Sequence, residues 1–392
     1  MKVCIINSIY LPYSRGGAEV VVEKIITGFL RQGHQVVLIT LGRKPAVERV
    51  HNFTIYRVRP CNVFSFLDIN RKPTWLRALW HPLDVYNFSG YWQIKKILRQ
   101  EKPQIVFTHN LKGLGYLVPA AIRRSDCQHV HTIHDVQLSR PSGIILYGQE
   151  KPFLILDKVY EKICRKLFGS PPVVISPSRW LQQFYRRLGF FPQSAQFVLP
   201  NPIILQRVAK QPASSGASGL RLLFVGQLEA FKGITLLLQA CRRLTGDWTL
   251  TIVGDGGKLS EIDRLIGGDK RFIRTGWVDR KRVTQLYLQA DVTVVPSLCY
   301  ENSPTVIYES LAANVPVIAA DIGGVAELVK DDYNGFTFAA GNEQNLVEVL
   351  QHFVDHPETV QRLRKNCFVS VRQYSIDRYI KQLLSYADTR TR

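Results

Sequence analysis

Short runs of apolar, mainly β-branched residues alternate with amphipathic segments along the whole chain. Such runs predict strands buried on both faces, and the amphipathic segments predict helices that cover a parallel sheet. The first half holds six runs, at residues 2–7, 34–40, 53–59, 104–109, 129–134 and 173–178. The second half holds six more, at 221–226, 248–254, 272–276, 292–297, 316–320 and 335–339. The pattern predicts an α/β protein of two Rossmann-like, doubly wound parallel-sheet domains.

The boundary between the two domains is marked by the prolines of VLPNPI at 198–203. The small polar run QPASSGASG at 211–219 predicts a surface loop. We therefore place an N-terminal domain at 1–200 and a C-terminal domain at 201–372. Ligands of open parallel sheets bind beyond the carboxyl ends of the strands, so two facing domains predict a cleft with one ligand held from each side.

The net charge of +20 is concentrated in the first half of the 392 residues. Residues 1–200 hold 28 Lys and Arg against 11 Asp and Glu, whereas residues 201–392 hold 23 against 20. Such a field favours a phosphorylated substrate, an anionic membrane surface or nucleic acid, with a soluble basic surface as the alternative. The basic residues are dispersed without a recognisable binding motif, which argues against nucleic acid.

The seven cysteines are scattered without a C-x-x-C pair, which argues against zinc ribbons, redox motifs and a disulfide framework. No run of 18 or more apolar residues is present, and the start MKVCIINSIY contains no cleavage site. We expect a cytoplasmic protein, or one bound peripherally to the inner face of the cell membrane.

A glycine-containing turn follows the first strand of each domain. In SRGGAE (14–19), Gly16 and Gly17 permit close backbone approach, and a helix starting near Ala18 offers free N–H groups to an anion. The pattern is not G-x-G-x-x-G, so no nicotinamide cofactor is indicated. In FVGQLEAFKG (224–233), Lys232 is spaced to aim its ammonium at a phosphate, although a lone lysine is more often a solvated surface residue.

Paired carboxylates distinguish the stretch CYENSPTVIYES, in which Glu301 and Glu309 stand eight positions apart. Ser303 or Asn302 is expected to cap a helix that has Pro304 as its first residue and ends at a left-handed Asn314. N–H groups around Ser303, Thr305 and Val306 offer an oxyanion or phosphate site. Carboxylates there would repel phosphate and are better suited to accept hydrogen bonds from sugar hydroxyls.

Two further segments leave alternatives open. His129, His131, His134 and Asp135 in HVHTIHD could form a metal site, but no additional ligand spacing supports it. Residues 62–99 combine aromatic side chains with six cations, which suits the headgroup region of a bilayer. The alternative for 62–99 is a helix pair packed on the first domain, with Trp75 and Leu79 in the core.

Taken together, the motifs resemble those of retaining nucleotide-sugar glycosyltransferases of family 4, which have the GT-B fold. The resemblance is carried by Glu301-x7-Glu309, Gly323-Gly324-x2-Glu327, Phe224-Val-Gly, Lys232-Gly, IVGDG (252–256), Gly16-Gly17, THNLKGLG and TIHDV. It extends over essentially the whole chain. It further implies that the C-terminal helix, within 373–392, crosses back to complete the first domain.

The resemblance implies a role for each candidate residue. Glu309 would bind the nucleotide ribose and Glu301 the hydroxyls of the transferred sugar. The amides after Asn302 would bind that sugar or the diphosphate, and Asn302, Ser303, Pro304 and Thr305 would line the donor site. Lys232 would neutralise the diphosphate with help from Gly17, and His134 would contact the donor sugar near the reacting carbon. The base would rest near Trp277 and Val278. Gly16, His109 and Asn110 would line the acceptor side.

The family pattern implies no cofactor and no metal, because Lys232 and backbone amides would stabilise the leaving diphosphate. A UDP- or GDP-sugar would be the co-substrate, and the acceptor a glycan, a polyprenyl-diphosphate-linked sugar or a lipid, in cell-surface polysaccharide or glycolipid synthesis. Departures from the family are Gln227 in place of a frequent Arg, Pro202 in a Pro-Asn-Pro hinge, and Asn302-Ser303-Pro304 in place of a glycine-rich run. Alternatives are a nucleotide-sugar epimerase or hydrolase of this fold, and a non-catalytic sugar- or nucleic-acid-binding protein.

Overall fold

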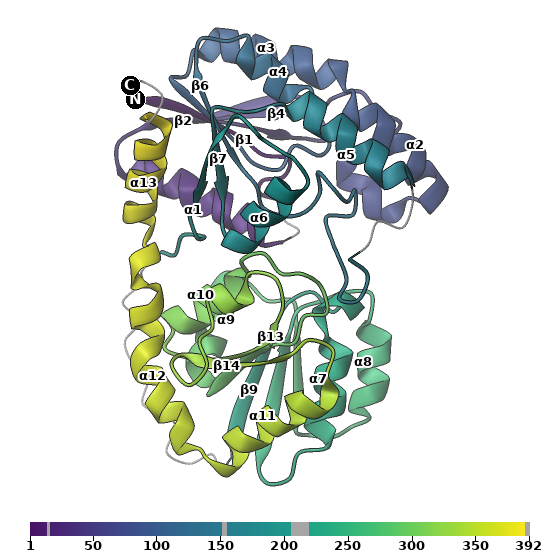
Figure 1. Cartoon of the computed structure of the whole chain (residues 1–392), viewed down its shortest axis with the longest axis vertical. Coiled ribbons are helices and arrows are strands. Elements are labelled where there is room, and N and C mark those ends of the chain that lie inside the picture. Colours follow the sequence, from purple (N-terminus) through teal and green to yellow (C-terminus); the bar gives the residue numbers. More distant parts are fainter. Residues whose placement is uncertain (14–15, 151–154, 205–218, 389–392) are drawn as a thin grey trace. The chain divides into compact units, whose positions relative to one another are not determined.

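The structure, a computed structural model, describes residues 1–13, 16–150, 155–204 and 219–388, which form two compact units (Figure 1). The first unit contains the described parts of 1–144, 151–202 and 376–392, and the second contains 145–150 and 203–375. The units differ from the predicted domains at three places: residues 145–150 and 373–375 belong to the second unit, and residues 201–202 belong to the first. Apart from Gly219, the predicted loop at 211–219 lies outside the described residues.

The sheet of the first unit has the strand order β3-β4-β2-β1-β5-β6-β7-β8. Its strands are β1 (Lys2–Ile6), β2 (Gln35–Leu41), β3 (Ala46–Val50), β4 (Phe53–Val58), β5 (Ile105–Thr108), β6 (Gln128–Thr132), β7 (Val173–Ser176) and β8 (Ala195–Val198). All neighbours are parallel except β3 and β4. The six predicted strands are present, with ends shifted by at most two residues.

Two edge strands of this sheet were not predicted. Every residue of β3 is exposed, so its sequence lacks the apolar pattern of a buried strand. It forms as the antiparallel partner of β4. The four residues of β8 are only half-buried, because a strand at the edge of a sheet has one neighbour.

The sheet of the second unit is entirely parallel, in the order β11-β10-β9-β12-β13-β14. Its strands are β9 (Leu220–Val225), β10 (Trp248–Val253), β11 (Phe272–Gly276), β12 (Val292–Val295), β13 (Val317–Asp321) and β14 (Gly335–Ala339). All six were predicted. The two sheets establish the predicted α/β architecture of two doubly wound domains.

Helices cover these sheets and bury their apolar faces. Those of the first unit are α1 (Gly17–Arg31), α2 (Thr74–Val85), α3 (Phe88–Glu101), α4 (Val118–Arg123), α5 (Ile155–Phe168), α6 (Arg179–Arg187) and α13 (Ile376–Asp388). Those of the second are α7 (Ile234–Arg242), α8 (Leu259–Ile266), α9 (Arg280–Gln289), α10 (Thr305–Ala312), α11 (Glu343–Asp355) and α12 (Glu358–Val371). No helix among the described residues is long and apolar enough to cross a bilayer.

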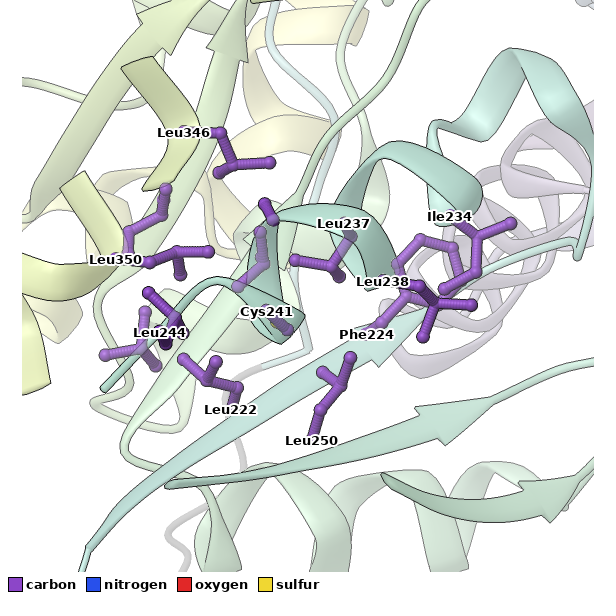
Figure 2. Close-up of a cluster of buried hydrophobic side chains, with 14 of the residues drawn as sticks. Leu222, Phe224, Ile234, Leu237, Leu238, Cys241, Leu244, Leu250, Leu346 and Leu350 are labelled. Atoms are coloured by element: carbon purple, nitrogen blue, oxygen red, sulfur yellow. The ribbon is translucent and has the colours of Figure 1, made fainter. Parts of the chain in front are cut away.

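The core of the second unit shows how the sequence pattern becomes packing (Figure 2). Leu222 and Phe224 of β9 and Leu250 of β10 face α7, which contributes Leu237, Leu238 and Cys241. Leu346 and Leu350 of α11 close the same cluster from the other side of α7. Burying such a set of side chains holds the strand ends, and the loops that leave them, in fixed positions.

The C-terminal helix α13 packs on α1 within the first unit (Figure 1). Gly28 of α1 permits the approach, because a side chain there would collide with Ile376 and Ile380. Ile376, Ile380 and Leu383 of α13 are buried. The last helix is thus part of the first unit, although the chain reaches it from the second.

Residues 62–99 do form a helix pair, α2 and α3, but its predicted core was wrong. Trp75 and Leu79 are exposed, at 66% and 56% of their surface, whereas Trp80 is fully buried. The Trp80 indole N–H donates to the carbonyl of Phe64 at 2.9 Å, and its ring stacks with Phe64 and Phe66. In this position the Trp80 ring is buried and its N–H has a hydrogen-bond acceptor, so the helix faces Trp80 inward and Trp75 and Leu79 outward.

Candidate functional site

In each unit, polar residues gather where the sheet order reverses. In the second sheet, β10 and β11 follow on one side of the central neighbours β9 and β12, and β13 and β14 follow on the other side. In the first sheet, the corresponding central neighbours are β1 and β5. Loops leaving the carboxyl ends of two such strands diverge to opposite faces, which leaves room for a ligand between them. The predicted Lys232 follows β9 and Glu301 follows β12.

Lys232 and Glu301 meet directly. The Lys232 ammonium donates to Glu301 Oε1 at 2.5 Å, and the Ser297 hydroxyl donates to the same oxygen at 2.8 Å. The two charged side chains are 27% and 13% exposed. Burial alone would lower the pKa of Lys232, but the adjacent Glu301 outweighs it and raises that pKa above its usual value. Lys232 therefore carries its charge at neutral pH.

A glycine places Lys232 against the end of β12. Lys232 ends a short 3₁₀ turn, Ala230–Lys232, and Gly233 follows in the left-handed conformation (φ +71°) before α7. A side chain at Gly233 would collide with the carbonyl of Pro296 in the loop after β12. In the Lys-Gly pair of the motif, the cation Lys232 is thus followed by a glycine because only glycine permits this close backbone contact.

The Gly-Gly pair after β13 supports Glu301 from the other side. Gly324 N–H donates to the Glu301 carbonyl at 2.7 Å. Gly323 adopts φ +68°, and a side chain there would collide with that same carbonyl oxygen. The two glycines therefore fix the backbone of Glu301, while Glu327 lies in the 3₁₀ turn Val325–Glu327 that follows.

Residues Ile145–Glu150 form a third support, which the sequence did not reveal. Tyr300 N–H donates to Ile145 O, and Tyr147 N–H donates to Leu298 O, both at 2.9 Å. The Tyr300 hydroxyl adds a bond to Glu150 Oε1 at 2.9 Å. The pairing joins segments about 150 residues apart, so no local pattern signals it. It explains why 145–150 belong to the second unit.

Helix α10 differs from its prediction at the start and agrees at the end. Pro304 is the N-cap and Thr305 the first helical residue. Ser303 is buried, and its hydroxyl pairs with the Tyr308 hydroxyl at 2.7 Å. At the other end Asn314 is left-handed (φ +59°), as predicted, and Val315 N–H donates to Ser310 O.

Glu309 lies in the second turn of α10, as predicted. The Tyr287 hydroxyl of α9 donates to Glu309 Oε2 at 3.5 Å and to the Val306 carbonyl at 3.4 Å. A carboxylate can accept several hydrogen bonds at once, so Glu309 is chemically suited to bind hydroxyl groups.

The loops after β9, β10 and β11 are tied to one another. Gly226 N–H donates to Val253 O, and Gly254 N–H donates to Gly276 O, each at 3.0 Å. A side chain at Gly254 would collide with Gly226 O, which explains the glycine of IVGDG. Gln227 and Asp255 lie in these loops, as do the predicted base-contacting residues Trp277, which is 77% exposed, and Val278.

In the first unit, the loops after β1 and β5 are joined at the corresponding position. The Asn110 carbonyl accepts from Ser8 N–H at 2.8 Å and from the Ser8 hydroxyl at 2.7 Å. Asn110 N–H donates to Asn7 Oδ1 at 3.2 Å. Asn7 and Ser8 were not among the predicted residues; their signal was their place directly after the first strand.

Gly16 and Gly17 begin helix α1 as its N-cap and first residue. Gly16 N–H donates to the Glu19 carboxylate at 2.7 Å. A carboxylate oxygen thus occupies the kind of position in which a helix N-terminus binds an anion. Ser14 and Arg15 of the same motif lie outside the described residues.

His134 is paired with His109 through a 2.8 Å contact between His109 Nδ1 and His134 Nε2, and their rings stack 5.1 Å apart. Burial lowers the pKa of His134 to about 4 and that of His109 well below its usual value. Both imidazoles are therefore neutral at pH 7, and one donates to the other. The neighbouring Asp135 accepts from Gln137 N–H at 2.8 Å, and burial raises its pKa to about 6.

The metal alternative for HVHTIHD finds no support in this geometry. His129 Nε2 and His131 Nδ1 both hydrogen-bond to the Thr108 hydroxyl, at 2.8 and 2.9 Å, inside the sheet. Within the described ranges no group of three or more His, Cys, Asp or Glu side chains is placed to hold a metal ion.

Two family models match consecutive parts of the chain: Glycosyltransferase Family 4 over residues 15–207 and Glycosyl transferases group 1 over residues 210–368. An uncharacterized 42.6 kDa protein in the cps region of Klebsiella pneumoniae is 25% identical, over 84% of this chain and 87% of that protein. The UDP-Gal:alpha-D-GlcNAc-diphosphoundecaprenol alpha-1,3-galactosyltransferase of Escherichia coli is 26% identical, over 69% and 71%.

Solved structures share the fold over nearly the whole chain. Sucrose-phosphate synthase from Thermosynechococcus elongatus superposes with a TM-score of 0.77 at 19% identity, covering 98% of both chains. HepE from Anabaena, in complex with UDP-glucose, superposes with a TM-score of 0.71 at 17% identity, covering 98% of this chain and 99% of that one.

The glycine contacts generate a prediction. Gly323→Ala and Gly268→Ala both place a side chain at positive φ, which costs about 1 kcal/mol of unfolding free energy. Gly268 (φ +85°) has open space around it, whereas Gly323 faces the Glu301 carbonyl. We expect Gly323→Ala to lose roughly 1–3 kcal/mol more than Gly268→Ala in denaturant unfolding, because Glu301 must move. Equal losses would show that Gly323 does not position Glu301.

Proposed function

The chain is a glycosyltransferase of the family 4 type with the GT-B fold, and from that premise we propose that it transfers a sugar with retention of anomeric configuration. The donor is a UDP- or GDP-sugar. The acceptor is a hydroxyl of a glycan, of a polyprenyl-diphosphate-linked sugar or of a lipid, in cell-surface polysaccharide or glycolipid synthesis.

The Lys232–Glu301 pair is the observation that carries this proposal. It combines a charged ammonium with a carboxylate at the switch point of the second sheet, on supports that fix both backbones. An ammonium matches a diphosphate, and a carboxylate matches the hydroxyls of a sugar. A nucleotide-diphosphate sugar contains a diphosphate and sugar hydroxyls side by side. It therefore matches the pair better than a free nucleotide or a free sugar would.

The remaining donor contacts follow from neighbouring loops of the same unit. Glu309 accepts hydrogen bonds from the ribose hydroxyls, and the base lies along the backbone at Trp277 and Val278. The first N–H groups of α10, near Thr305, complete the diphosphate site together with the helix dipole. Gln227 donates an amide where a charged Arg is frequent in the family, so we expect weaker diphosphate binding.

The transfer step places the developing charge on Lys232. The bond between the anomeric carbon and the diphosphate oxygen breaks, and its electron pair goes to that oxygen. The acceptor hydroxyl attacks the same face and passes its proton to the departing phosphate. Lys232 and the α10 amides stabilise the charge that develops on the diphosphate. For Gly17 and His134 we propose the roles that the family resemblance implies, contact with a phosphate and with the donor sugar.

The acceptor class is supported by the relatives. The E. coli relative is named for a diphosphoundecaprenol-linked acceptor sugar, and the K. pneumoniae relative for its place in the cps region. In this chain the acceptor residues are Gly16, His109 and Asn110, beside the switch point of the first sheet. The amide side chain of Asn110 suits sugar hydroxyls, which need both donors and acceptors. His109 is buried, so its imidazole acts by orienting His134.

Removal of Lys232 tests the donor site. We expect UDP or GDP, or its sugar conjugate, to raise the melting temperature of the wild-type protein, because a ligand bound only by the folded state stabilises it. Lys232→Ala should abolish the rise. Lys258→Ala is the matched control, since Lys258 forms an equally short 2.5 Å pair with Glu261 but is more exposed. A rise that survives Lys232→Ala, or is lost in both variants, would contradict the assignment.

The stereochemistry of the product tests retention. With an α-linked donor sugar and an acceptor, we expect NMR of the product to show the coupling of an α-linked anomeric proton. A β-linked product would contradict retention. Release of free sugar at the same rate without any acceptor would favour the hydrolase alternative.

A further inference from the structure

An apolar surface is exposed on α2 and α3 of the first unit. Seven of the eighteen large apolar side chains that are exposed in the described residues fall within 63–92. They are Val63, Trp75, Leu79, Leu83, Tyr86, Phe88 and Trp92, and we call them the α2–α3 apolar surface. Most isolated exposed apolar residues need no explanation, but a concentration of this kind marks an interaction site.

Helical spacing places the members on α2 on one outward face and those on α3 on another, while Val63 and Tyr86 lie outside the two helices. Trp75, Leu79 and Leu83 recur every four residues along α2, while Trp80 and Asp84 on the opposite side are buried. On α3 the exposed Phe88 and Trp92 are followed on the same face by cations. Helix α2 therefore has an inner apolar face that belongs to the core and an outer one that faces solvent.

The charges around this surface are mostly positive. Residues 63–99 contain Arg71, Lys72, Arg77, Lys95, Lys96 and Arg99. The acidic residues in that range are Asp84, which is buried and accepts a hydrogen bond from Gly113 N–H, and Asp68, whose carboxylate is paired with Arg43 at 3.0 Å. Lys95 Nζ lies 5.1 Å from the Trp92 ring centroid. An aromatic ring beside an ammonium group is favourable at the headgroup level of a bilayer, where the ring contacts apolar chains and the ammonium contacts phosphates.

We propose that the α2–α3 apolar surface docks on an anionic lipid bilayer. Trp75, Leu79 and Leu83 enter the boundary between headgroups and acyl chains, while Lys95 and Lys96 contact lipid phosphates. A second copy of this chain fits less well, because two such faces would bring like charges together. The proposal concerns the first unit alone and does not depend on the proposed donor site.

Vesicle flotation of the full chain tests the proposal, with phosphatidylcholine vesicles and vesicles that also contain phosphatidylglycerol. We expect binding to the anionic vesicles that weakens with salt. Trp75→Ser/Leu79→Ser/Leu83→Ser should weaken this binding more than about tenfold. Val47→Ser/Val50→Ser is the matched control, because these residues are exposed apolar side chains on β3 of the same unit; its binding should equal that of wild type.

A second pair of variants separates the charge contribution. Lys95→Gln/Lys96→Gln should weaken anionic-vesicle binding by roughly fivefold per cation. Arg378→Gln/Lys381→Gln, exposed cations on α13, should change it less. The nucleotide-induced rise in melting temperature should be unchanged in all variants, which also reports that they fold. Failure of the wild-type protein to bind, or equal binding by the triple variant, would overturn the proposal. A wild-type protein that is dimeric, binds no vesicles and becomes monomeric in the triple variant would also overturn the proposal.

Discussion

The second unit is organised around one electrostatic contact, in which the ammonium of Lys232 and the carboxylate of Glu301 share a partly buried position. A charge removed from water is costly unless a partner compensates it, so each member of the pair stabilises the other in the absence of ligand. Both groups are also the ones that a diphosphate sugar needs. Under the proposed function, the ion pair keeps this charged site ordered until the diphosphate provides an alternative partner for Lys232.

Such a contact requires two loops to approach within bonding distance, and the fold provides this through strand order and glycine. Thr293 of β12 lies opposite Leu223 of β9, so the two loops start from adjacent strands. Gly233 packs against Pro296, Gly324 bonds to Glu301, and Ile145–Tyr147 pairs with Leu298–Tyr300. The glycines of the sequence motif are thus explained by backbone contacts to the loops that hold Lys232 and Glu301. The first sheet repeats the arrangement with neutral groups, where Ser8 and Asn110 join the ends of β1 and β5.

How far the sequence could predict this structure depended on how local each signal was. Buried strands such as β9 and β12 were predicted because their apolar runs are continuous, and Asn314 because a left-handed helix end needs a tolerant residue. Strand β3 was missed because its exposed residues lack an apolar pattern, although its partner β4 follows directly in the chain. The 145–150 segment was missed because it pairs only with residues about 150 positions away. Trp75 and Trp80 could not be told apart by composition, since both faces of α2 are apolar and only tertiary packing decides which one is buried.

The most direct test of the account is the affinity of UDP and GDP for Glu301→Gln, measured by calorimetry beside the wild-type protein and Glu327→Gln. If Lys232 is shared between Glu301 and the diphosphate, removal of the Glu301 charge frees the ammonium. The nucleotide that binds should then bind more tightly to Glu301→Gln than to the wild-type protein, and the gain should exceed that of Glu327→Gln. Weaker binding to Glu301→Gln would mean that the ion pair helps to hold the diphosphate instead of competing with it, and would contradict the account.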